Sequence, residues 1–447
     1  MDQRQTPTAE LIARLRAKDV TLGVIGLGYV GLPVCVTVAE AGLRILGFDT
    51  DPSKVKQINQ GISYFQHIPS ERITAAVHGC FLTATDDFAR LSEPDILLIC
   101  VPTPLTAHSE PDLSFVTSTA ETIARHLRRG QMIVLESTTY PGTTTEVLLP
   151  ILESSGLKAD VDFLLAFSPE REDPGNPEHS SAKIPKVVGA DSPDAQEAVT
   201  TLYSYFAPRV VKVSSSATAE AVKLTENIFR AVNIALVNEL KIIFEPMGID
   251  IWEVIEAAKT KPFGFMPFYP GPGLGGHCVP IDPFYLTWKA RQHGIGTQFI
   301  ELAGRINTAM PQHVIDKLAV ALDARHGKSL KASSILVLGI AYKKNVQDTR
   351  ESPALRIMDL LEARGADVGY HDPYVPVIPQ TREHKSLAGR RSRPLLPAEL
   401  GAYDALLIVT DHDCIDYKRL VENAKLVIDT RNVCRRAGIA SPNVVLA

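Results

Sequence analysis

A single cysteine, Cys278, stands within the stretch YPGPGLGGHCVPIDP at 269–283. The four glycines of this stretch let the backbone come close to a bound molecule, and the prolines around them disfavour both helix and strand. Asp282 follows four residues later on the same predicted loop. A thiol in this setting suits a covalent nucleophile, with the carboxylate holding water or a proton. The alternative is a small buried residue in a glycine turn.

A lysine and an asparagine, Lys223 and Asn227, stand four residues apart in a segment with helical periodicity. Residues at this spacing share one face of a helix. An ammonium and a side-chain amide that project together would form an oxyanion hole for a tetrahedral intermediate. The alternative is the solvated face of an ordinary helix.

The hexapeptide GLGYVG places Gly26, Gly28 and Gly31 in G-x-G-x-x-G spacing, after an apolar strand and at the start of a helix. This context is typical of a turn that binds the pyrophosphate of a dinucleotide. Asp49 ends the next predicted strand, where a carboxylate accepts hydrogen bonds from a ribose diol and repels a 2′-phosphate. The pattern predicts NAD rather than NADP, although Lys54 would offset part of that repulsion.

A second pair, Tyr285 and Lys289, has the Y-x-x-x-K spacing of short-chain dehydrogenases and sugar-nucleotide epimerases. The pair lies much farther from the glycine turn than in those enzymes, and the glycine pattern differs. We interpret the spacing as chance.

The elements around these residues predict an α/β fold of two Rossmann-like doubly wound domains joined by a long central helix. The first βαβ unit opens at 20–51, and apolar strands follow at 95–102 and 132–138. The segment 217–244 lacks glycine and proline and has apolar residues at helical spacing, which predicts one long helix. A second α/β pattern opens at 333–373, where lysines replace the glycines of the first turn, so we expect no dinucleotide there. The predicted domains are 1–215 for NAD, 216–325 for the central helices, the cysteine loop and a dimer interface, and 326–447 for UDP.

Composition favours an ordinary globular protein that binds small molecules. The chain has 447 residues, 45% hydrophobic and 22% charged, with a formal net charge of -5. This balance gives no basic surface for nucleic acid, and no apolar run is long enough to span a membrane or to serve as a signal peptide. We expect a cytoplasmic protein without a metal site or a disulfide framework, because its cysteines form no C-x-x-C pair. They are Cys35, Cys80, Cys100, Cys278, Cys414 and Cys434.

Six motifs together resemble the UDP-sugar 6-dehydrogenase family, over about 22–433. They are GLGYVGLP, ESTTYPGTT, SPEREDPGN, EAVKLTENIFRAVNIALVNEL, GPGLGGHCVPIDP and AYKKNVQDTRESPA. The resemblance implies a four-electron oxidation of the sugar C6 alcohol to a carboxylate with two NAD. It also implies a UDP-sugar substrate and a homodimer or higher homo-oligomer. A bacterial role in supplying uronic acid donors for surface polysaccharide follows from it.

The resemblance assigns roles to individual residues. Cys278 resembles the nucleophile that forms a thiohemiacetal and then a thioester, Lys223 and Asn227 the pair that stabilises oxyanions, and Asp282 the carboxylate that handles water or a proton. Thr138 resembles the residue that assists this water, and Glu170 a glutamate that orders substrate and water. The implied cofactor contacts are Gly26, Gly28, Tyr29, Val30, Gly31, Asp49, Lys54, Thr103 and Thr138; the implied substrate contacts are Glu170, Lys223, Asn227, Tyr269, Gly275, Lys343 and Arg431.

Two departures from the motifs of the UDP-glucose branch bear on the identity of the sugar. The branch for UDP-glucose usually has a second glutamate where this chain has Pro174, which leaves open whether Glu172 or Asp173 takes its role. His277 before the cysteine and Ile281 after it resemble the branch for N-acetylated sugars, and we expect UDP-N-acetylglucosamine. His277 has no assigned role.

The alternatives are UDP-N-acetylmannosamine or UDP-N-acetylgalactosamine, which differ from the expected sugar in the configuration at C2 or C4, and then UDP-glucose. A regulator that binds NAD and a sugar nucleotide without turnover is an alternative of another class. An NAD-dependent epimerase would release no net NADH.

Overall fold

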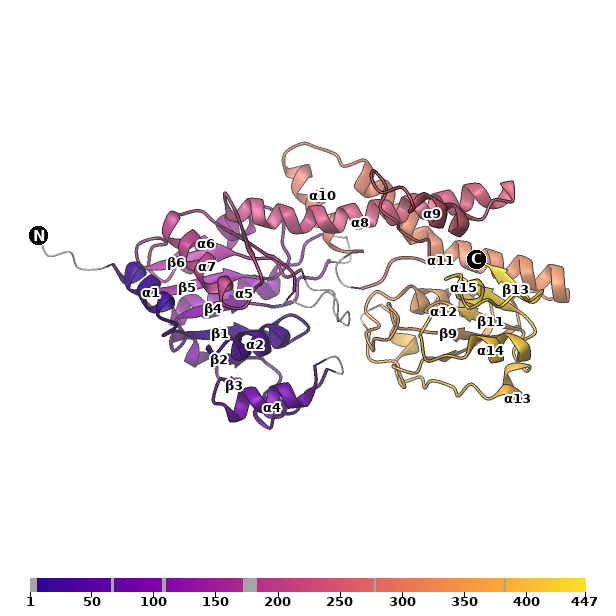
Figure 1. The fold of residues 1–447 in the computed structure, drawn as a ribbon, viewed down its shortest axis with the longest axis horizontal. Helices are drawn as coiled ribbons and strands as arrows, with labels where there is room; N and C mark the ends of the chain where they lie inside the picture. The colour runs from indigo at the N-terminus through magenta and orange to yellow at the C-terminus, as the bar shows by residue number, and fades with distance from the viewer. Residues whose placement is uncertain (1–5, 66–67, 107–109, 172–182, 277–278, 382) are drawn as a thin grey trace, which may run out of the picture. The chain divides into compact units, whose positions relative to one another are not determined.

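The computed structural model describes residues 6–65, 68–106, 110–171, 183–276, 279–381 and 383–447. It divides into two compact units, Met1–Glu226 with Phe284–Ile295, and Asn227–Pro283 with Gly296–Ala447. Each unit has its own sheet and its own hydrophobic core (Figure 1).

The first unit contains an eight-stranded sheet in the order β3-β2-β1-β4-β5-β6-β7-β8. Neighbouring strands are parallel except β6 and β7, which pair antiparallel. The strand order reverses direction between β1 and β4, and parallel α/β sheets bind ligands at the carboxyl ends of such a crevice. The strands are β1 (Thr21–Ile25), β2 (Arg44–Phe48), β3 (Leu82–Thr85), β4 (Ile96–Ile99), β5 (Gln131–Leu135), β6 (Phe163–Phe167), β7 (Lys186–Ala190) and β8 (Val210–Val213).

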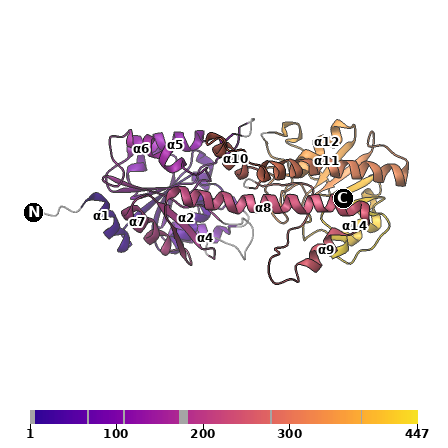
Figure 2. The ribbon, with the colours of Figure 1, turned by 90° about the horizontal axis from the view of Figure 1, so that it is seen from above.

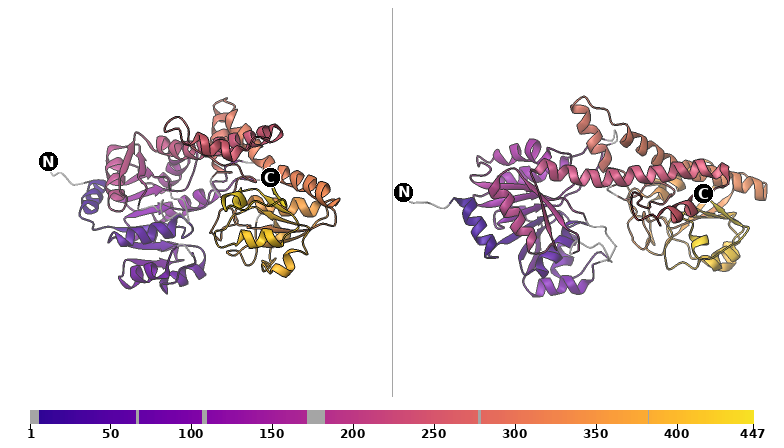
Figure 3. Two further views of the ribbon diagram at one scale, coloured as in Figure 1. Left: turned by 45° about the vertical axis from the view of Figure 1, so that its right-hand side comes forward. Right: turned by 45° about the horizontal axis from the view of Figure 1, so that its top comes forward.

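Helices cover both faces of this sheet (Figure 3). Side chains alternate along a strand, so Leu22 and Val24 of β1 enter one core and Ile25 the other. The first core also takes residues from α1, α2, α3, α4 and α7, and the second takes them from α5 and α6. The helices are α1 (Pro7–Arg16), α2 (Gly31–Glu40), α3 (Pro52–Asn59), α4 (Ser70–His78), α5 (Ser114–His126), α6 (Leu149–Glu153), α7 (Pro193–Ser204) and α10 (Asp282–Gln292), with short turns η1 (Phe88–Ser92) and η2 (Thr144–Leu148).

Local sequence fixes the start of α3 beside β2. Asp51 caps the helix because its carboxylate accepts a hydrogen bond of 2.9 Å from the Ser53 amide, and Pro52 supplies a φ suited to the first helical position. The cap places Lys54 in the first turn of the helix.

The segment predicted as one long helix is α8 (Ser216–Phe244), an unbroken helix to which both units contribute residues (Figure 2). It is followed by η3 (Glu245–Met247) and α9 (Ile251–Ala258). Trp252 and Ile255 of α9 form a small core with Val237 of α8. Apolar packing against α9 therefore holds this part of α8 in place.

The second unit contains a five-stranded parallel sheet in the order β10-β9-β11-β12-β13. Two cores lie on its two faces, one shared with α11 and α12 and one with α14 and α15. The strands are β9 (Ser334–Leu338), β10 (Asp367–His371), β11 (Ala405–Ile408), β12 (Val427–Asp429) and β13 (Val444–Leu446); the helices are α11 (Phe299–His326), α12 (Pro353–Ala363), α13 (Pro397–Leu400), α14 (Tyr417–Asn423), α15 (Val433–Arg436) and the turn η4 (Lys385–Leu387).

The predicted fold class is confirmed, with two doubly wound α/β sheets and a long central helix. The predicted domain boundaries after 215 and 325 stay a prediction. Within the described residues, no helix combines the length and the apolar character that crossing a membrane would require.

Candidate functional site

The turn after β1 carries the three predicted glycines, and packing fixes two of them. Gly26 has a φ of +90°, and a Cβ there would lie 2.7 Å from the Cys100 carbonyl oxygen. A Cβ on Gly31 would lie 1.9 Å from the carbonyl oxygen of Gly26. Around Gly28, by contrast, a Cβ would meet no atom within 4 Å. The fold requires Gly26 and Gly31, whereas Gly28 leaves open space where a ligand can approach the backbone.

Asp49 lies directly after β2, buried beside this turn. Its Oδ2 accepts a hydrogen bond of 2.9 Å from the Leu27 amide, and its Oδ1 accepts one of 2.9 Å from the Asp51 amide. Lys54 Nζ lies 3.2 Å from Oδ2. Since each carboxylate oxygen can accept more than one hydrogen bond, Asp49 keeps capacity for a ribose diol. The open backbone at Gly28, the start of α2 at Gly31 and the fixed carboxylate together fit a dinucleotide.

The other residues predicted to contact the cofactor lie near the same edge of the sheet or in the turn after β1. Tyr29 and Val30 are half-buried, and the Tyr29 ring lies 4.4 Å from the ring of Phe65. Thr103 is buried in the loop after β4, and Thr138 is half-buried in the loop after β5. The carboxyl ends of two neighbouring strands thus position the two threonines.

The Tyr285 and Lys289 pair has structural partners in α10. The Tyr285 hydroxyl donates to the carbonyl oxygen of Thr103 at 2.9 Å, and Lys289 Nζ lies 2.6 Å from a carboxylate oxygen of Glu146. Both side chains attach α10 to the first unit. Both side chains thus have structural contacts, and the interpretation of their spacing as chance stays a prediction.

Glu170 follows β6, and its carboxylate is held by side chains that the sequence did not single out. Lys186, the first residue of β7, has its Nζ 2.7 Å from Glu170 Oε2 and 3.3 Å from Glu136 Oε2. Tyr203 of α7 donates its hydroxyl to the other oxygen of Glu136. The available signal was a charged residue at the start of one apolar strand and others after the ends of two more, which is a weak pattern by itself.

Lys223 and Asn227 lie one turn apart on α8, both buried, with exposed fractions of 8% and 2%. Within the second unit, Asn227 Nδ2 donates a hydrogen bond of 2.6 Å to Oδ2 of Asp282, the first residue of α10. Asp282 is 2% exposed. Two predicted site residues that are far apart in the chain are therefore in direct contact, and neither belongs to a solvated helix face.

The glycine-rich loop packs closely on its own unit. A Cβ on Gly271 would lie 2.8 Å from Nη1 of Arg431, and one on Gly275 would lie 2.7 Å from the Tyr342 Cβ. Arg431 Nε donates to the Val409 carbonyl oxygen at 2.9 Å, which aims the guanidinium toward the loop. The loop glycines thus allow the approach of Arg431 and of the turn after β9.

Two other predicted substrate contacts lie in the second unit. Tyr269 is exposed, stacks on Trp252 with ring centroids 5.5 Å apart, and donates its hydroxyl to Glu256. Lys343 is half-buried in the turn after β9.

The second sheet has a carboxylate at the position equivalent to Asp49, and it is hydrogen-bonded to other groups of the protein. Asp372 follows β10, and its Oδ2 accepts from the amides of Ile340 and Ala341 at 2.7 and 3.0 Å. His412 Nε2 lies 3.0 Å from the same oxygen, and its Nδ1 accepts the Asn345 amide, so the proton is on Nε2. The Asp372 carboxylate is therefore held by groups of the protein itself, and the expectation that this sheet holds no dinucleotide stays a prediction.

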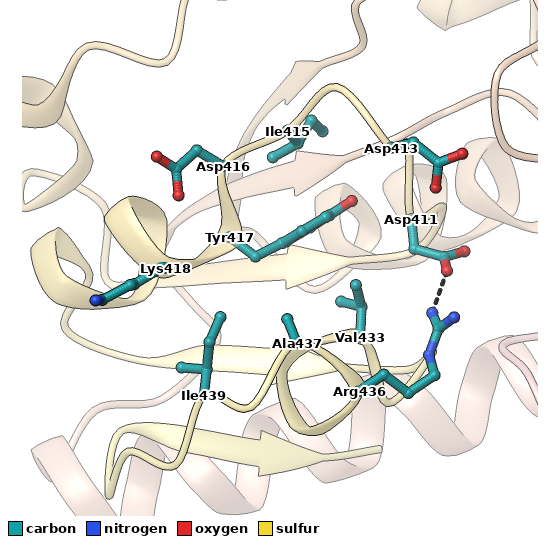
Figure 4. Close-up of a pocket in the computed structure, with 10 residues that line it drawn as sticks. All are labelled: Asp411, Asp413, Ile415, Asp416, Tyr417, Lys418, Val433, Arg436, Ala437 and Ile439. Carbon is teal, nitrogen blue, oxygen red and sulfur yellow. Dashed lines mark hydrogen bonds and ion pairs between the residues drawn. The ribbon is translucent and has the colours of Figure 1, made fainter.

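A pocket of about 400 Å³ lies in the second unit, near the carboxyl ends of β11 and β12 (Figure 4). Arg436 on its rim is paired with Asp411. Among the described residues, no predicted site residue lines it. Its lining is Asp411, Asp413, Ile415, Asp416, Tyr417, Lys418, Val433, Arg436, Ala437 and Ile439.

Five residues that the sequence analysis names lie outside the described residues: Glu172, Asp173, Pro174, His277 and Cys278. Their predicted roles stay predictions from the sequence.

Models of the UDP-glucose/GDP-mannose dehydrogenase family match three consecutive segments of the chain. The NAD binding domain matches 20–207, the central domain 217–309 and the UDP binding domain 336–436. The chain belongs to this family. It is an NAD-dependent UDP-sugar dehydrogenase, and NAD is the dinucleotide that the turn after β1 and Asp49 fit.

Individual members show how this UDP-sugar dehydrogenase relates to known proteins. It is 35% identical to UDP-N-acetyl-D-glucosamine 6-dehydrogenase of Pseudomonas aeruginosa, over 88% of this chain and 91% of the relative. It is 33% identical to NDP-N-acetyl-D-galactosaminuronic acid dehydrogenase of Ralstonia nicotianae, over 95% and 100%. The solved UDP-D-ManNAc dehydrogenase of Pyrococcus horikoshii superposes with a TM-score of 0.85 at 33% identity, over 95% of this chain and 98% of that one. The three relatives carry different sugars in their names.

Proposed function

We propose that this dehydrogenase oxidises the C6 hydroxyl of a UDP-N-acetylhexosamine, first of all UDP-N-acetylglucosamine, to the uronic acid through a covalent cysteine intermediate. The observation that carries the proposal is the buried contact between Asn227 and Asp282, which follows Cys278 by four residues in the sequence. A simple alcohol oxidation needs neither an oxyanion donor nor a nucleophile, whereas an oxidation that continues to the acid needs both.

The chemistry follows from side chains of this chain. Bound NAD accepts one hydride in each of the two oxidation steps. After the first step the thiolate of Cys278 adds to the C6 aldehyde and forms a thiohemiacetal, and the second step converts it to a thioester. Water then attacks the thioester carbonyl, the C–S bond breaks, and the acid leaves while the thiolate is restored.

Buried polar groups support these steps. Lys223 supplies positive charge, and the second amide hydrogen of Asn227 donates to the oxyanion, since the first is used by Asp282. Asp282 takes a proton from the attacking water, assisted by Thr138. Glu170 orders the sugar and this water.

Cationic and loop residues of the second unit support UDP binding. Lys343 and Arg431 carry charges suited to a pyrophosphate, and the Arg431 guanidinium is anchored at its Nε. Tyr269 is the first residue of the glycine-rich stretch at 269–283, and Gly275 lies near its middle. We propose the same functional division as the sequence predicts, with NAD at 1–215, the catalytic loop in 216–325 and UDP at 326–447.

The assembly we propose is a homodimer built on α8. Phe229, Leu236 and Ile243 recur every seven residues along the helix and are 49%, 49% and 42% exposed. A stripe of large apolar side chains of this kind is normally covered by a partner. We further propose that the enzyme works in the cytoplasm and supplies uronic acid donors for surface polysaccharide.

The test is the yield of NADH per mole of sugar nucleotide at limiting concentration. UDP-N-acetylglucosamine is compared with UDP-N-acetylmannosamine, UDP-N-acetylgalactosamine and UDP-glucose. We expect two NADH per UDP-N-acetylglucosamine and little turnover of the others. Two NADH from another sugar would change the substrate and keep the mechanism. One NADH would remove the covalent role of Cys278, and none with any sugar would favour a binding protein without turnover.

A further inference from the structure

The ends of three neighbouring strands bring Glu136, Glu170 and Lys186 together in the first unit. Glu136 follows β5 and Glu170 follows β6, at the carboxyl edge of the sheet. β7 runs antiparallel to β6 with Ala166 opposite Ala190. If this register is continued past the end of β6, Glu170 stands opposite Lys186. The sheet topology itself therefore places the ammonium between the two carboxylates.

Lys186 is 8% exposed, and Glu136 is 1% exposed. Lys186 Nζ lies 2.7 Å from Glu170 Oε2 and 3.3 Å from Glu136 Oε2. It also lies 5.3 Å from the ring centroid of Tyr203. The ammonium of Lys186 thus pairs with two carboxylates, and its shorter contact is with Glu170.

The charges of this cluster depend on each other. Burial raises the pKa of Glu136 above its ordinary value. Burial alone would lower the pKa of Lys186, but the carboxylates of Glu136 and Glu170 raise it overall. Lys186 therefore stays charged at neutral pH.

Glu170 is held from a second side by the backbone. Its Oε1 accepts a hydrogen bond of 2.7 Å from the Arg171 amide. Arg171 itself is anchored, because its Nη2 lies 2.6 Å from Oε1 of Glu226 on α8 and its Nη1 donates to the Pro185 carbonyl oxygen. Each oxygen of Glu170 has its own donor, so both the position and the rotation of the carboxylate are fixed.

A buried ion pair is weak support for stability, because desolvating both charges costs about as much as their attraction returns. The cluster is better explained by what it does to Glu170, which is only partly covered, with 13% of its side chain exposed. We propose that Lys186 is a positioning residue for Glu170, holding its carboxylate ionised and in place, while Glu136 competes with Glu170 for the same ammonium. This inference rests on the role of Glu170 in the proposed function.

The experiment compares the pH profile of kcat/KM for UDP-N-acetylglucosamine in the wild type, Lys186→Met, Lys186→Arg and Glu170→Gln. In Lys186→Met we expect at least a tenfold lower kcat and an acid limb moved up by about one pH unit, since the positive charge beside the carboxylate is lost. Lys186→Arg should return the limb to within about 0.3 pH unit of the wild type. Glu170→Gln should lack this limb.

Two more variants distinguish a positioning role of Lys186 from a role in folding alone. Tyr203→Phe removes the hydroxyl on the far side of Glu136 and should leave the acid limb where it is. Glu136→Gln keeps the shape, removes the competing carboxylate, and should move the limb to lower pH by about half a unit. If Lys186→Met does not fold, Glu136→Gln tests the positioning role of Lys186, because a purely structural role predicts no shift of the acid limb in that variant.

The outcomes distinguish this inference from the function on which it rests. A limb that is lost in Glu170→Gln but unmoved in Lys186→Met or Glu136→Gln would overturn the role of Lys186 alone. A wild-type profile in Glu170→Gln would overturn the role of Glu170 and this inference with it. No NADH from the wild type with any UDP-sugar would overturn the proposed function and, through it, the positioning role.

Discussion

Asn227 donates a hydrogen bond of 2.6 Å from its side-chain amide to Oδ2 of Asp282, and both side chains are buried. The contact joins the middle of α8 to the first residue of α10, within the second unit. Because an ionised carboxylate only accepts hydrogen bonds, the nitrogen of the amide must face it. Removing this donor would leave a buried charge without one of its partners, which is costly.

We therefore predict that Asn227→Ala lowers kcat about 10- to 100-fold and lowers the free energy of unfolding by about 1–3 kcal/mol. KM for NAD should stay unchanged, because Gly28 and Asp49 are untouched. Steady-state kinetics and denaturant titration check both effects. The matched control is Asn233→Ala on the same helix, where the amide donates to the Phe229 carbonyl oxygen. Equal losses in the two variants would contradict a special role for Asn227.

The covalent route makes a prediction for Cys278. Cys278→Ser should lower NADH formation from UDP-N-acetylglucosamine by at least about 1000-fold, because a serine hydroxyl is a far weaker nucleophile than a thiolate. Calorimetry should show that the variant still binds the sugar nucleotide. Cys414→Ser, which changes an exposed free cysteine, should keep full activity. Full turnover by Cys278→Ser would show that the mechanism is wrong.

Periodicity and turn chemistry predicted the fold well because both act locally. The apolar strands, the glycine turn and the long helix follow from residues that lie close together in the chain. The same reasoning placed Gly26, Gly31 and Asp49 at the edge of the sheet, since each lies at the end of a predicted element.

Contacts between segments that are distant in the chain were harder to predict from the sequence. The cluster of Glu136, Lys186 and Tyr203 depends on the antiparallel register of β7, which no local pattern specifies. A lysine at the start of an apolar strand looks the same whether it faces solvent or two carboxylates. Spacing placed Lys223 and Asn227 on one helix face, but only the folded chain shows that Asn227 is committed to Asp282.

The glycines of the cofactor turn give a matched pair of variants. Gly28→Ala should keep the wild-type melting temperature, because its Cβ meets no atom within 4 Å, but it should raise KM for NAD at least tenfold, since the methyl group occupies space needed by the pyrophosphate. Gly31→Ala should destabilise the first unit, because its Cβ would lie 1.9 Å from the Gly26 carbonyl oxygen. Thermal unfolding and NAD titration separate the two effects. A destabilised Gly28→Ala with unchanged KM would contradict the assignment of the open space to the cofactor.

Lys241 on α8 predicts how the stability of the second unit depends on pH. Its side chain is 7% exposed, and within the described part of the chain its ammonium makes no hydrogen bond or ion pair. Burial lowers the pKa of Lys241 to about 8, with Glu245 and Asp429 opposing the shift and Arg431 and Lys317 adding to it. Lys241 also lies close enough to His313 on α11 to lower the pKa of that histidine further.

The direction of this pH dependence follows from the protonation of Lys241 in the folded and unfolded states. In the unfolded chain a lysine keeps its proton up to a pH of about 10.4, so between pH 8 and that value the unfolded state binds more protons and stability rises with pH. Below about pH 8 the full cost is present, and it is about 3 kcal/mol. Lys241→Met keeps the apolar stem and removes the charge. We expect it to raise the free energy of unfolding at pH 7 by up to that amount, and by progressively less toward pH 10.

Denaturant titrations at pH 7, 8.5 and 10 measure this trend. The control is Lys331→Met, an exposed lysine of the same unit that is not among the charges acting on Lys241, so its loss should give no gain that fades with rising pH. A gain in Lys241→Met that is equal at all three pH values would mean that packing, not charge, separates the variants. A loss of stability at pH 7 would mean that the ammonium has a partner that stabilises the folded state.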